Sequence, residues 1–222
     1  HDFQNRFMLN DGTGNFTDII QTTGINPNDL GAWENQSGDF DNNGFVDIFS
    51  EMSSELYLNN GDLTFTGMNL NFDEGAIGDF NNDGFLDFYI GTGAPAFNKI
   101  VPNRLFLNDS GNSFTDITMS ARVGHLQKGH GVAFGDLDND GDQDIYAQLG
   151  GAYSSDVFQD ALFENPGHGN NWICLQLIGI RANRCAIGTK VTLVIEEKGQ
   201  KRKIVRKVTS GSSFGGNSLR LE

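Results

Sequence analysis

Short apolar stretches alternate with turn residues along the whole chain. Each stretch is a few residues long, carries apolar or aromatic side chains with a period of two, and ends in Gly, Asn or Asp. No stretch keeps a helical period over about eleven residues. Alternation of this kind is typical of β-strands with one buried face, and the polar clusters are typical of turns. The pattern therefore predicts an all-β protein made of short strands.

Two sequence elements recur, and together they define the repeat. The first occurs three times, at offsets of 40 and 57 residues, as GDFDNNGFVDIF (38–49), GDFNNDGFLDFY (78–89) and GDLDNDGDQDIY (135–146). The second recurs out of phase with the first, as NRFMLNDGTGNFTDII (5–20), ELYLNNGDLTFTGM (55–68), NRLFLNDSGNSFTDIT (103–118) and a shortened ALFENPGHGN (161–170). Each unit reads as four short strands around an acidic loop; in the third unit HGVAF (130–134) enters the loop and QDIYAQL (143–149) leaves it. Four-stranded units at periods of about 40–50 residues predict the blades of a β-propeller.

The blade count predicts a partial β-propeller. The chain contains the second half of one blade, two complete blades and most of a fourth, whereas closed propellers have about four to eight blades. Either further blades come from a longer parent chain, or a small ring closes by pairing residues 5–20 with the last blade. We expect the first arrangement, because the sequence starts inside a repeat.

The formal net charge of −14 is unevenly distributed. Up to Asn165 the chain has 26 Asp and Glu but 5 Lys and Arg, whereas from Pro166 onward it has 3 acidic and 10 basic residues. We therefore expect two modules, residues 1–166 and 167–222. An acidic surface of this size repels the phosphates of nucleic acid and favours cations or basic partners. The nearest acidic partner of the basic module is the N-terminal one. The sequence contains no run of about 18 apolar residues, so we expect no membrane span.

The basic module reads as a small β unit. WICLQLIGI (172–180) predicts a strand, and TKVTLVIEE (189–197) and KRKIVRKVT (201–209) predict a hairpin around a Lys198-Gly199 turn. The pattern favours a solvated basic face over a ligand site for five side chains: Lys201, Arg202, Lys203, Arg206 and Lys207. Cys174 and Cys185 either form a disulfide or are two free buried thiols, because spacing alone does not fix their geometry.

The three acidic loops share the spacing D-x-[DN]-x-[DN]-G-x-x-D. Calcium binds about six to eight oxygen atoms, and alternating carboxylates and amides on a tight loop place such atoms on one side of it. Gly44, Gly84 and Gly141 permit the sharp turn, and the carbonyl of the next residue is expected to face the ion. The candidate ligands are Asp39, Asp41, Asn43, Phe45 and Asp47; Asp79, Asn81, Asp83, Phe85 and Asp87; and Asp136, Asp138, Asp140, Asp142 and Asp144.

Other interpretations of these loops fit less well. An EF-hand needs an acidic residue at its twelfth position and flanking helices, but the twelfth positions here are Ser50, Ile90 and Ala147. Asp, Asn and Gly also form turns without metal, yet three copies in one register favour a cation. Ligand number favours calcium over magnesium, and zinc is not expected because no Cys or His joins the loops. We therefore expect about three calcium ions.

The third loop is expected to depend most on calcium. Its Asp142 stands where the other loops have Phe45 and Phe85, so its side chain adds a charge while only its carbonyl is expected at the ion. Calcium sites of extracellular modules are weak, and millimolar calcium is an extracellular condition. We therefore expect an extracellular, periplasmic or cell-surface location.

The loops and their preceding strands, above all VAFGDLDNDGDQD, resemble the FG-GAP/VCBS repeats of integrin-α-like β-propellers. That resemblance implies calcium bound between the first two strands of a blade. Residues 170–221 resemble the ASPIC/UnbV module, which follows such repeats in proteins similar to cartilage acidic protein and in bacterial relatives. The matching features are Asn171-Trp172, SGSSFG (210–215), and Asn183, Arg184, Ala186, Ile187 and Gly188 of the NRCAIG run. The chain stops before the glycine-rich ending of that module, and Cys185 falls at a variable position.

Two functional hypotheses remain open. The first is a non-enzymatic calcium-stabilised binding or adhesion module with a protein or glycan partner on the loop face. The second is a polysaccharide-active enzyme or its accessory domain. His125 and His130 lie five residues apart in an insert, where loop histidines without a special role are commoner than a catalytic pair. No nucleophile elbow, P-loop or H-E-x-x-H motif is present, so we assign no catalytic residue.

Overall fold

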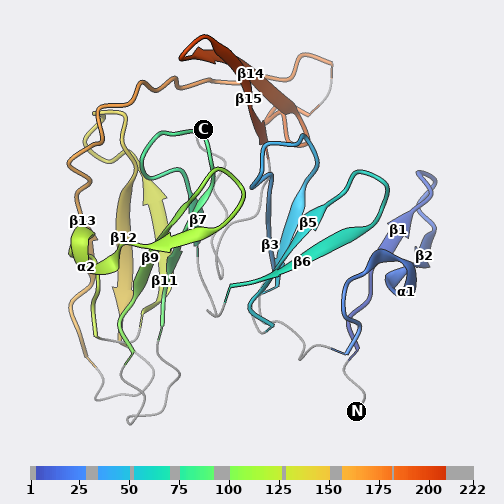
Figure 1. Ribbon diagram of the computed structural model, residues 1–222, viewed down its shortest axis with the longest axis horizontal. Coiled ribbons are helices and arrows are strands. Elements are labelled where there is room, and N and C mark those ends of the chain that lie inside the picture. The colour runs from blue at the N-terminus through green and yellow to red at the C-terminus, as the bar shows by residue number, and fades with distance from the viewer. Residues whose placement is uncertain are drawn as a thin grey trace.

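The computed structural model describes residues 4–28, 35–50, 53–70, 76–92, 101–126, 129–150, 157–181 and 183–208. Within these ranges the chain forms small antiparallel sheets, and those made by β1 to β13 follow one another across the molecule in sequence order (Figure 1). These sheets lie side by side, as propeller blades do, and the sheet of β14 and β15 lies over one end of them. The predicted all-β class is therefore confirmed.

Two of the sheets have four strands and the others have fewer. We call them the half-blade, the first, second and third blades, and the hairpin. The half-blade contains β1 (Met8–Asn10) and β2 (Phe16–Asp18). The first blade contains β3 (Asn35–Gly38), β4 (Asp47–Ser50), β5 (Glu55–Asn59) and β6 (Phe65–Asn69). The second contains β7 (Ala76–Gly78), β8 (Asp87–Ile90), β9 (Arg104–Asn108) and β10 (Phe114–Asp116). The third contains β11 (Gly129–Gly135), β12 (Asp144–Leu149) and β13 (Ala161–Phe163), and the hairpin contains β14 (Lys190–Glu197) and β15 (Gln200–Lys207).

The predicted division into half a blade, two complete blades and most of a fourth is confirmed by this strand order. Two four-residue helices follow the half-blade and the second blade, α1 (Ile20–Thr23) and α2 (Thr118–Ala121). In the described part of the chain, no helix is long and apolar enough to cross a membrane. Among the described residues, β1 and β2 pair with each other and not with β13, and they lie on the opposite side of the molecule from it (Figure 1). The small closed ring is therefore not the arrangement found here.

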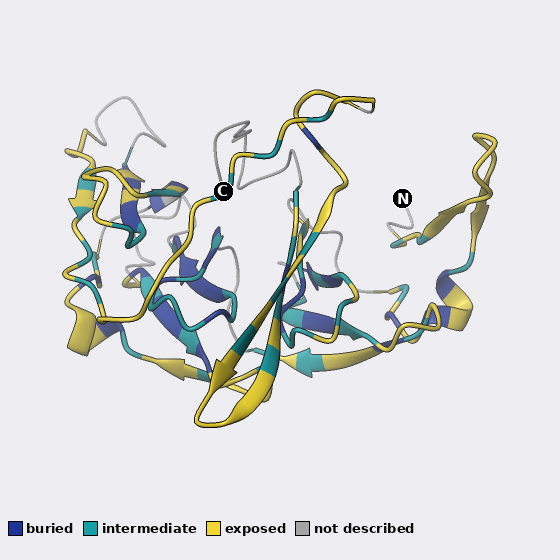
Figure 2. Cartoon of the chain, turned by 90° about the horizontal axis from the view of Figure 1, so that it is seen from above, coloured by how far each residue is buried: buried dark blue, intermediate teal, exposed yellow. Residues whose placement is uncertain are grey.

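Aromatic side chains fill the space between neighbouring blades. Phe88 of β8 is fully buried and stacks on Phe40 of the first blade, with ring centroids 4.9 Å apart. It also contacts Phe49, at 4.8 Å, and Phe114, at 5.1 Å. A second cluster joins the second and third blades, where the Phe80 and Phe134 rings meet edge to face at 4.6 Å. Figure 2 shows the buried segments gathered within and between the blades, with most of the hairpin exposed.

The C-terminal module is only partly as predicted. The hairpin is confirmed, and both turn residues, Lys198 (φ 52°) and Gly199 (φ 78°), have the positive φ angles of a tight hairpin turn. The strand predicted at 172–180 is wrong, because these residues pair with no described strand. Without a neighbouring strand their apolar side chains have no sheet face to cover, and Ile180 is 95% exposed. The SGSSFG run lies outside the described residues.

The two cysteines are free and exposed. Cys174 and Cys185 therefore form no disulfide in this structure. The alternative prediction is two free, buried thiols. The thiols are free, as predicted, but they are exposed and not buried. Both lie in segments without a strand ladder, and no described segment buries them.

Truncating Phe88 tests the packing between the first two blades. Phe88→Ala should lower the free energy of unfolding by about 3–5 kcal/mol, because a fully buried ring contacted from both blades leaves a cavity. Urea unfolding followed by circular dichroism measures this loss. Phe16→Ala is the matched control, since Phe16 is 58% exposed. Equal effects of the two substitutions would contradict the inter-blade core.

Candidate metal centres

The acidic loops join the first and second strands of each blade. The first loop (39–46) joins β3 to β4, the second (79–86) joins β7 to β8, and the third (136–143) joins β11 to β12. Neighbouring loops touch: Asn42 of the first loop donates to the Gly84 carbonyl at 2.7 Å, and Asn82 of the second donates to the Gly141 carbonyl at 3.0 Å. The three loops therefore form one row at the end of the molecule that the hairpin covers (Figure 1).

Each loop winds around the carboxylate at its first position. The backbone N–H of the loop glycine donates to this carboxylate in all three copies: Gly44 to Asp39 at 2.8 Å, Gly84 to Asp79 at 2.9 Å and Gly141 to Asp136 at 3.1 Å. The same glycines have φ angles of 97°, 88° and 94°, which side chains rarely adopt. The requirement for glycine, predicted from the motif, is confirmed in each loop.

The carboxylate at the ninth position is buried in every copy. Asp47 accepts the N–H groups of Phe40 and Asn59, both at 2.8 Å. Asp87 accepts those of Phe80 and Asn108, both at 2.8 Å. Asp144 repeats the arrangement with Leu137 at 3.0 Å and Asn165 at 2.9 Å. The three side chains are at most 3% exposed. One carboxylate per blade thus fixes both the loop and the end of the third strand.

Burial makes the ionised form of several loop carboxylates unfavourable. Loss of water raises the pKa of Asp39 to about 6, of Asp47 to about 7 and of Asp87 to about 8, despite the backbone N–H groups that favour the charged form. Burial also raises the pKa of Asp79, against the attraction of Arg206. A carboxylate with such a shift gains from a nearby cation, which favours its charged form.

Two of the loops gather carboxylate oxygens closely enough to hold a metal ion. Ligand atoms of Asp39, Asp41 and Asp47 all lie within 4.8 Å of one another, as do those of Asp136, Asp138 and Asp140. Asp39 is 6% exposed, and its Oδ1 atom is buried without a hydrogen-bond partner among the described residues. A buried carboxylate oxygen is costly unless something binds it. The carboxylate oxygens of the first loop are therefore suited to binding a cation.

The second loop is different. Among the residues that the structure describes, no group of three carboxylates of this kind forms there. Asp79 instead pairs with Arg206 of β15, whose Nη2 atom lies 2.9 Å from its Oδ2 atom. The guanidinium of Arg202 donates to the Asp83 carbonyl and lies over the Phe85 ring, 5.4 Å from its centroid. Two arginines thus bring positive charge to a loop predicted to bind calcium.

Two of the predicted ligands are amides, Asn43 of the first loop and Asn81 of the second. In this structure both donate to carboxylates. Asn43 donates from Nδ2 to Asp41 Oδ2, and Asn81 donates from Nδ2 to Asp83 Oδ2, each at 3.0 Å. The oxygens of the same amides accept backbone N–H groups, Asn43 Oδ1 from Phe45 at 2.7 Å and Asn81 Oδ1 from Asp83 at 3.0 Å, so both amides are oriented by the loop itself. The carbonyl ligands Phe45, Phe85 and Asp142 stay predictions. The Asp142 side chain accepts from Asn82 at 2.7 Å, so it links two loops.

Sequence reasoning missed a set of asparagines that joins the blades. Asn108 closes β9 and donates to the carbonyls of Leu86 in its own blade and Phe40 in the first blade, both at 2.9 Å. Asn165 repeats this with Gln143, at 3.1 Å, and with Phe80 of the second blade, at 2.8 Å. The signal was present, because the second repeated element carries Asn at the same place in every copy: Asn10, Asn59, Asn108 and Asn165.

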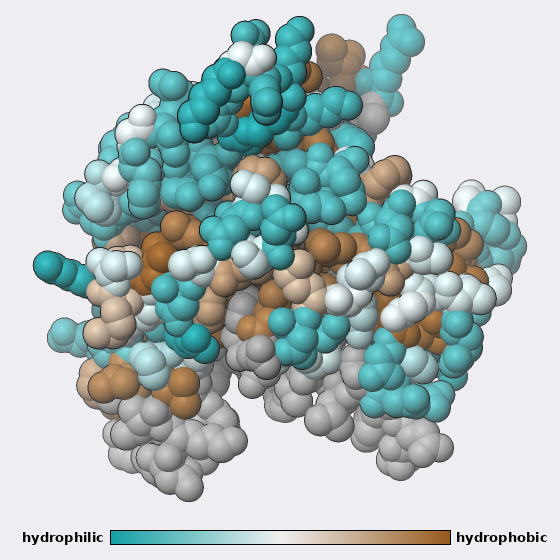
Figure 3. Space-filling model, viewed as in Figure 1, coloured by the Kyte–Doolittle hydropathy of each residue, from teal (hydrophilic) through white to brown (hydrophobic). Residues whose placement is uncertain are grey.

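The basic residues of the hairpin do not all lie on a solvated face. Lys201, Lys203 and Lys207 are exposed, as predicted. The prediction is wrong for Arg202 and Arg206, which are half-buried against the second loop. Lys190 of β14 donates to the Gly44 carbonyl, and Asn42 accepts the Val205 N–H at 2.8 Å. The hairpin therefore covers the first and second loops, and hydrophilic side chains gather at this end (Figure 3).

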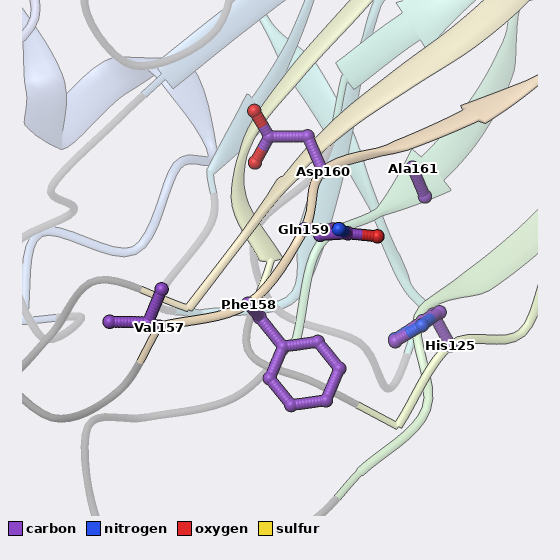
Figure 4. Close-up of a pocket in the computed structure, with 6 residues that line it drawn as sticks. All are labelled: His125, Val157, Phe158, Gln159, Asp160 and Ala161. Carbon is purple, nitrogen blue, oxygen red and sulfur yellow. The ribbon is translucent and has the colours of Figure 1, made fainter.

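A shallow depression beside the third blade contains His125. Of the two histidines considered as a catalytic pair, His125 is the one whose side chain the structure describes. The depression is lined by His125, Val157, Phe158, Gln159, Asp160 and Ala161 (Figure 4). His125 meets the Phe158 ring edge to face, with centroids 6.1 Å apart. Asp160 points away from His125 and accepts from the Tyr146 hydroxyl and the Leu149 N–H. The depression thus holds an imidazole and an aromatic ring, while its carboxylate is engaged by β12. The side chain of His130 lies outside the described residues.

Comparison with known proteins identifies the repeat. Residues 79–147 match a family model described as FG-GAP-like repeat. The match runs from the start of the second acidic loop, through the second blade, to β12 of the third. No curated protein matches the chain. The resemblance to FG-GAP repeats is therefore supported over this range, and the ASPIC/UnbV resemblance of residues 170–221 stays a prediction.

Replacing Asn108 tests the link between blades. Asn108→Ala should lower the free energy of unfolding by about 1–3 kcal/mol, because it leaves buried carbonyls of two blades without a donor. Chemical denaturation measures the change. Asn112→Ala is the control, since Asn112 makes only exposed turn contacts and should cost little. A loss at Asn108 no larger than at Asn112 would contradict the linking role.

Proposed function

We propose that the protein is a calcium-binding repeat module of the extracellular type, which binds a protein or glycan partner and catalyses no reaction. The observation that carries the proposal is the buried, unpartnered Oδ1 atom of Asp39 beside the carboxylates of Asp41 and Asp47. Three carboxylates at this spacing repel one another unless a cation lies between them. The repeated motif and the FG-GAP-like match support the same interpretation.

Calcium suits the first and third loops better than other common metal ions. Both offer only oxygen donors, and no cysteine or histidine stands within either loop sequence, which disfavours zinc. The loops wind through Asn and Gly residues with positive φ angles, so their ligands lie on an irregular shell. Calcium accepts such a shell with about six to eight oxygens, whereas magnesium requires a near-ideal octahedron.

The extracellular location follows from the expected affinity. The third loop is exposed at Asp136, Asp138 and Asp140, and exposed sites bind calcium weakly because water competes for the ion and for its ligands. Calcium sites of extracellular modules have dissociation constants of roughly 10⁻⁴–10⁻³ M. Such sites fill only where calcium is millimolar. FG-GAP-like repeats are also typical of extracellular proteins, which agrees with the match over residues 79–147.

The partner surface is narrower than the sequence suggested. The hairpin covers the first and second loops, so the whole loop face is not free for a partner. The third loop keeps its first three carboxylates exposed, and the outer face of the hairpin exposes Lys201, Lys203 and Lys207. We therefore place partner binding at this end of the molecule, on the exposed carboxylates of the third loop and the exposed lysines of the hairpin. Calcium-bound carboxylates are poor general acids, which favours binding over catalysis there.

A polysaccharide-active enzyme is the second candidate, and the depression at His125 and Phe158 is the observation that favours it. An aromatic ring beside an imidazole suits stacking on a sugar and proton transfer. Incubating the protein with a panel of acidic and neutral polysaccharides, and measuring new reducing ends, separates the two functions. We expect no turnover. Turnover that His125→Ala abolishes would replace the binding module with the enzyme.

Removing calcium should destabilise the protein. At a calcium concentration about tenfold above the dissociation constant, each site contributes about 1.4 kcal/mol. Two sites therefore raise the melting temperature by roughly 5–10 °C in a chain of this size. Thermal unfolding in calcium and in EDTA measures the shift, with magnesium at equal concentration as the control. An unchanged melting temperature under EDTA would contradict the proposal.

Asp138→Ala should remove one site. The substitution takes a carboxylate from the third loop while leaving the first loop intact, so calorimetry should show one fewer calcium ion bound and unchanged affinity at the remaining site. Asp62→Ala is the matched control, because Asp62 is an exposed turn residue whose carboxylate accepts from Thr64. Unaltered stoichiometry and affinity in Asp138→Ala would show that the third loop holds no calcium.

A further inference from the structure

The hairpin meets the second loop through alternate residues of β15. Arg202, Ile204 and Arg206 all contact it: Arg202 donates to the Asp83 carbonyl, and the Ile204 side chain lies against Gly84. Arg206 reaches Asp79 and also donates to the Gly84 carbonyl at 3.4 Å. Positions two apart on a strand share one face. One face of β15 is therefore directed at a single acidic loop.

Asp79 accepts backbone N–H groups from the same loop positions as Asp136 of the third loop does, and it has a guanidinium partner in addition. Its Oδ2 atom accepts from Arg206 and from the Gly84 N–H, both at 2.9 Å, and its Oδ1 atom accepts from the Asp83 N–H at 3.1 Å. The side chains of Arg206 and Asp79 are 31% and 17% exposed, so the pair is partly removed from water. A guanidinium held in this way supplies the positive charge that an ion supplies elsewhere.

The first and third loops lack such a residue. Within the described part of the chain, no lysine or arginine pairs with a carboxylate of either loop. Lys190 approaches the first loop, but it donates to the Gly44 carbonyl and leaves the Asp39 oxygen without a partner. The three loops share one motif, but only in the second loop does an arginine of the described chain offset the negative charge of a carboxylate.

We propose that Arg206 is the resident cation of the second loop: it occupies Asp79 in place of a divalent ion, so that only the first and third loops bind calcium while the second anchors the hairpin. The proposal rests on the calcium binding proposed above. It goes beyond calcium binding, because it assigns the number of bound ions to Arg206, a residue more than a hundred positions from the second loop. The C-terminal module thus fixes how many metal sites the repeats have.

Calorimetric titration with calcium tests this inference. We expect the wild type and Asp79→Asn each to bind two ions, because Asp79 takes no part in metal binding. Arg206→Gln should bind three, and Arg206→Gln combined with Asp79→Asn should return to two. Lys203→Gln is the matched control, since it removes the same charge from an exposed position of the same strand and should leave two ions.

The outcomes separate this inference from the proposed function. Three ions in the wild type, falling to two in Asp79→Asn, would overturn the role of Arg206 and leave calcium binding intact. Two ions in Arg206→Gln would also overturn it, with the two remaining sites showing that the variant is folded. No bound calcium in any variant would overturn the proposed function itself.

Limited proteolysis gives a second readout on the hairpin. Trypsin cleavage after Lys201 and Lys203 should accelerate at least severalfold in Arg206→Gln, because the hairpin loses its ion pair with the second loop, and should not accelerate when calcium is added to the wild type. Faster cleavage of the wild type as calcium is added would mean that the ion displaces Arg206. That result would contradict a resident guanidinium.

Discussion

The fold depends on one buried carboxylate in each blade. Asp47, Asp87 and Asp144 each accept two backbone N–H groups, one from the start of the acidic loop and one from the end of the neighbouring strand. Taking a carboxylate from water is costly, and two N–H groups offset only part of that cost. The raised pKa values of Asp47 and Asp87 report the remainder. Burial of these carboxylates therefore favours a nearby positive charge at the loop end of the first and second blades.

The same end of the molecule joins the blades to one another. Asn108 and Asn165 donate across to the previous blade, and Asn42 and Asn82 donate across to the next loop. Aromatic rings fill the space behind these polar links. Loop order and blade packing are thus coupled, so a cation bound at a loop would stabilise the neighbouring blades as well as the loop. The arginines of β15 enter this row from outside and bring charge to its middle member.

Much of the blade structure could be predicted from the sequence, because period-two patterns and turn residues act locally. The three loops, their glycines, the four-stranded units and the Lys198-Gly199 hairpin all follow from short stretches. Long-range contacts could not be predicted in this way. The pairing of Arg206 with Asp79 joins residues far apart in the chain. The alternation of basic and apolar residues along the strand predicts only that Arg206 lies on a solvated face. The segment at 172–180 fails for a related reason: its apolar pattern specifies a strand, but a strand requires a partner that no local pattern supplies.

We infer that cations complete the acidic loops and that the second loop carries its own in Arg206. A crystal structure of the full chain grown in millimolar calcium tests this most directly. We expect an ion coordinated by Asp39, Asp41 and Asp47, another coordinated by Asp136, Asp138 and Asp140, and Arg206 still paired with Asp79. Empty first and third loops at saturating calcium, with the Asp39 oxygen bound to water alone, would contradict it.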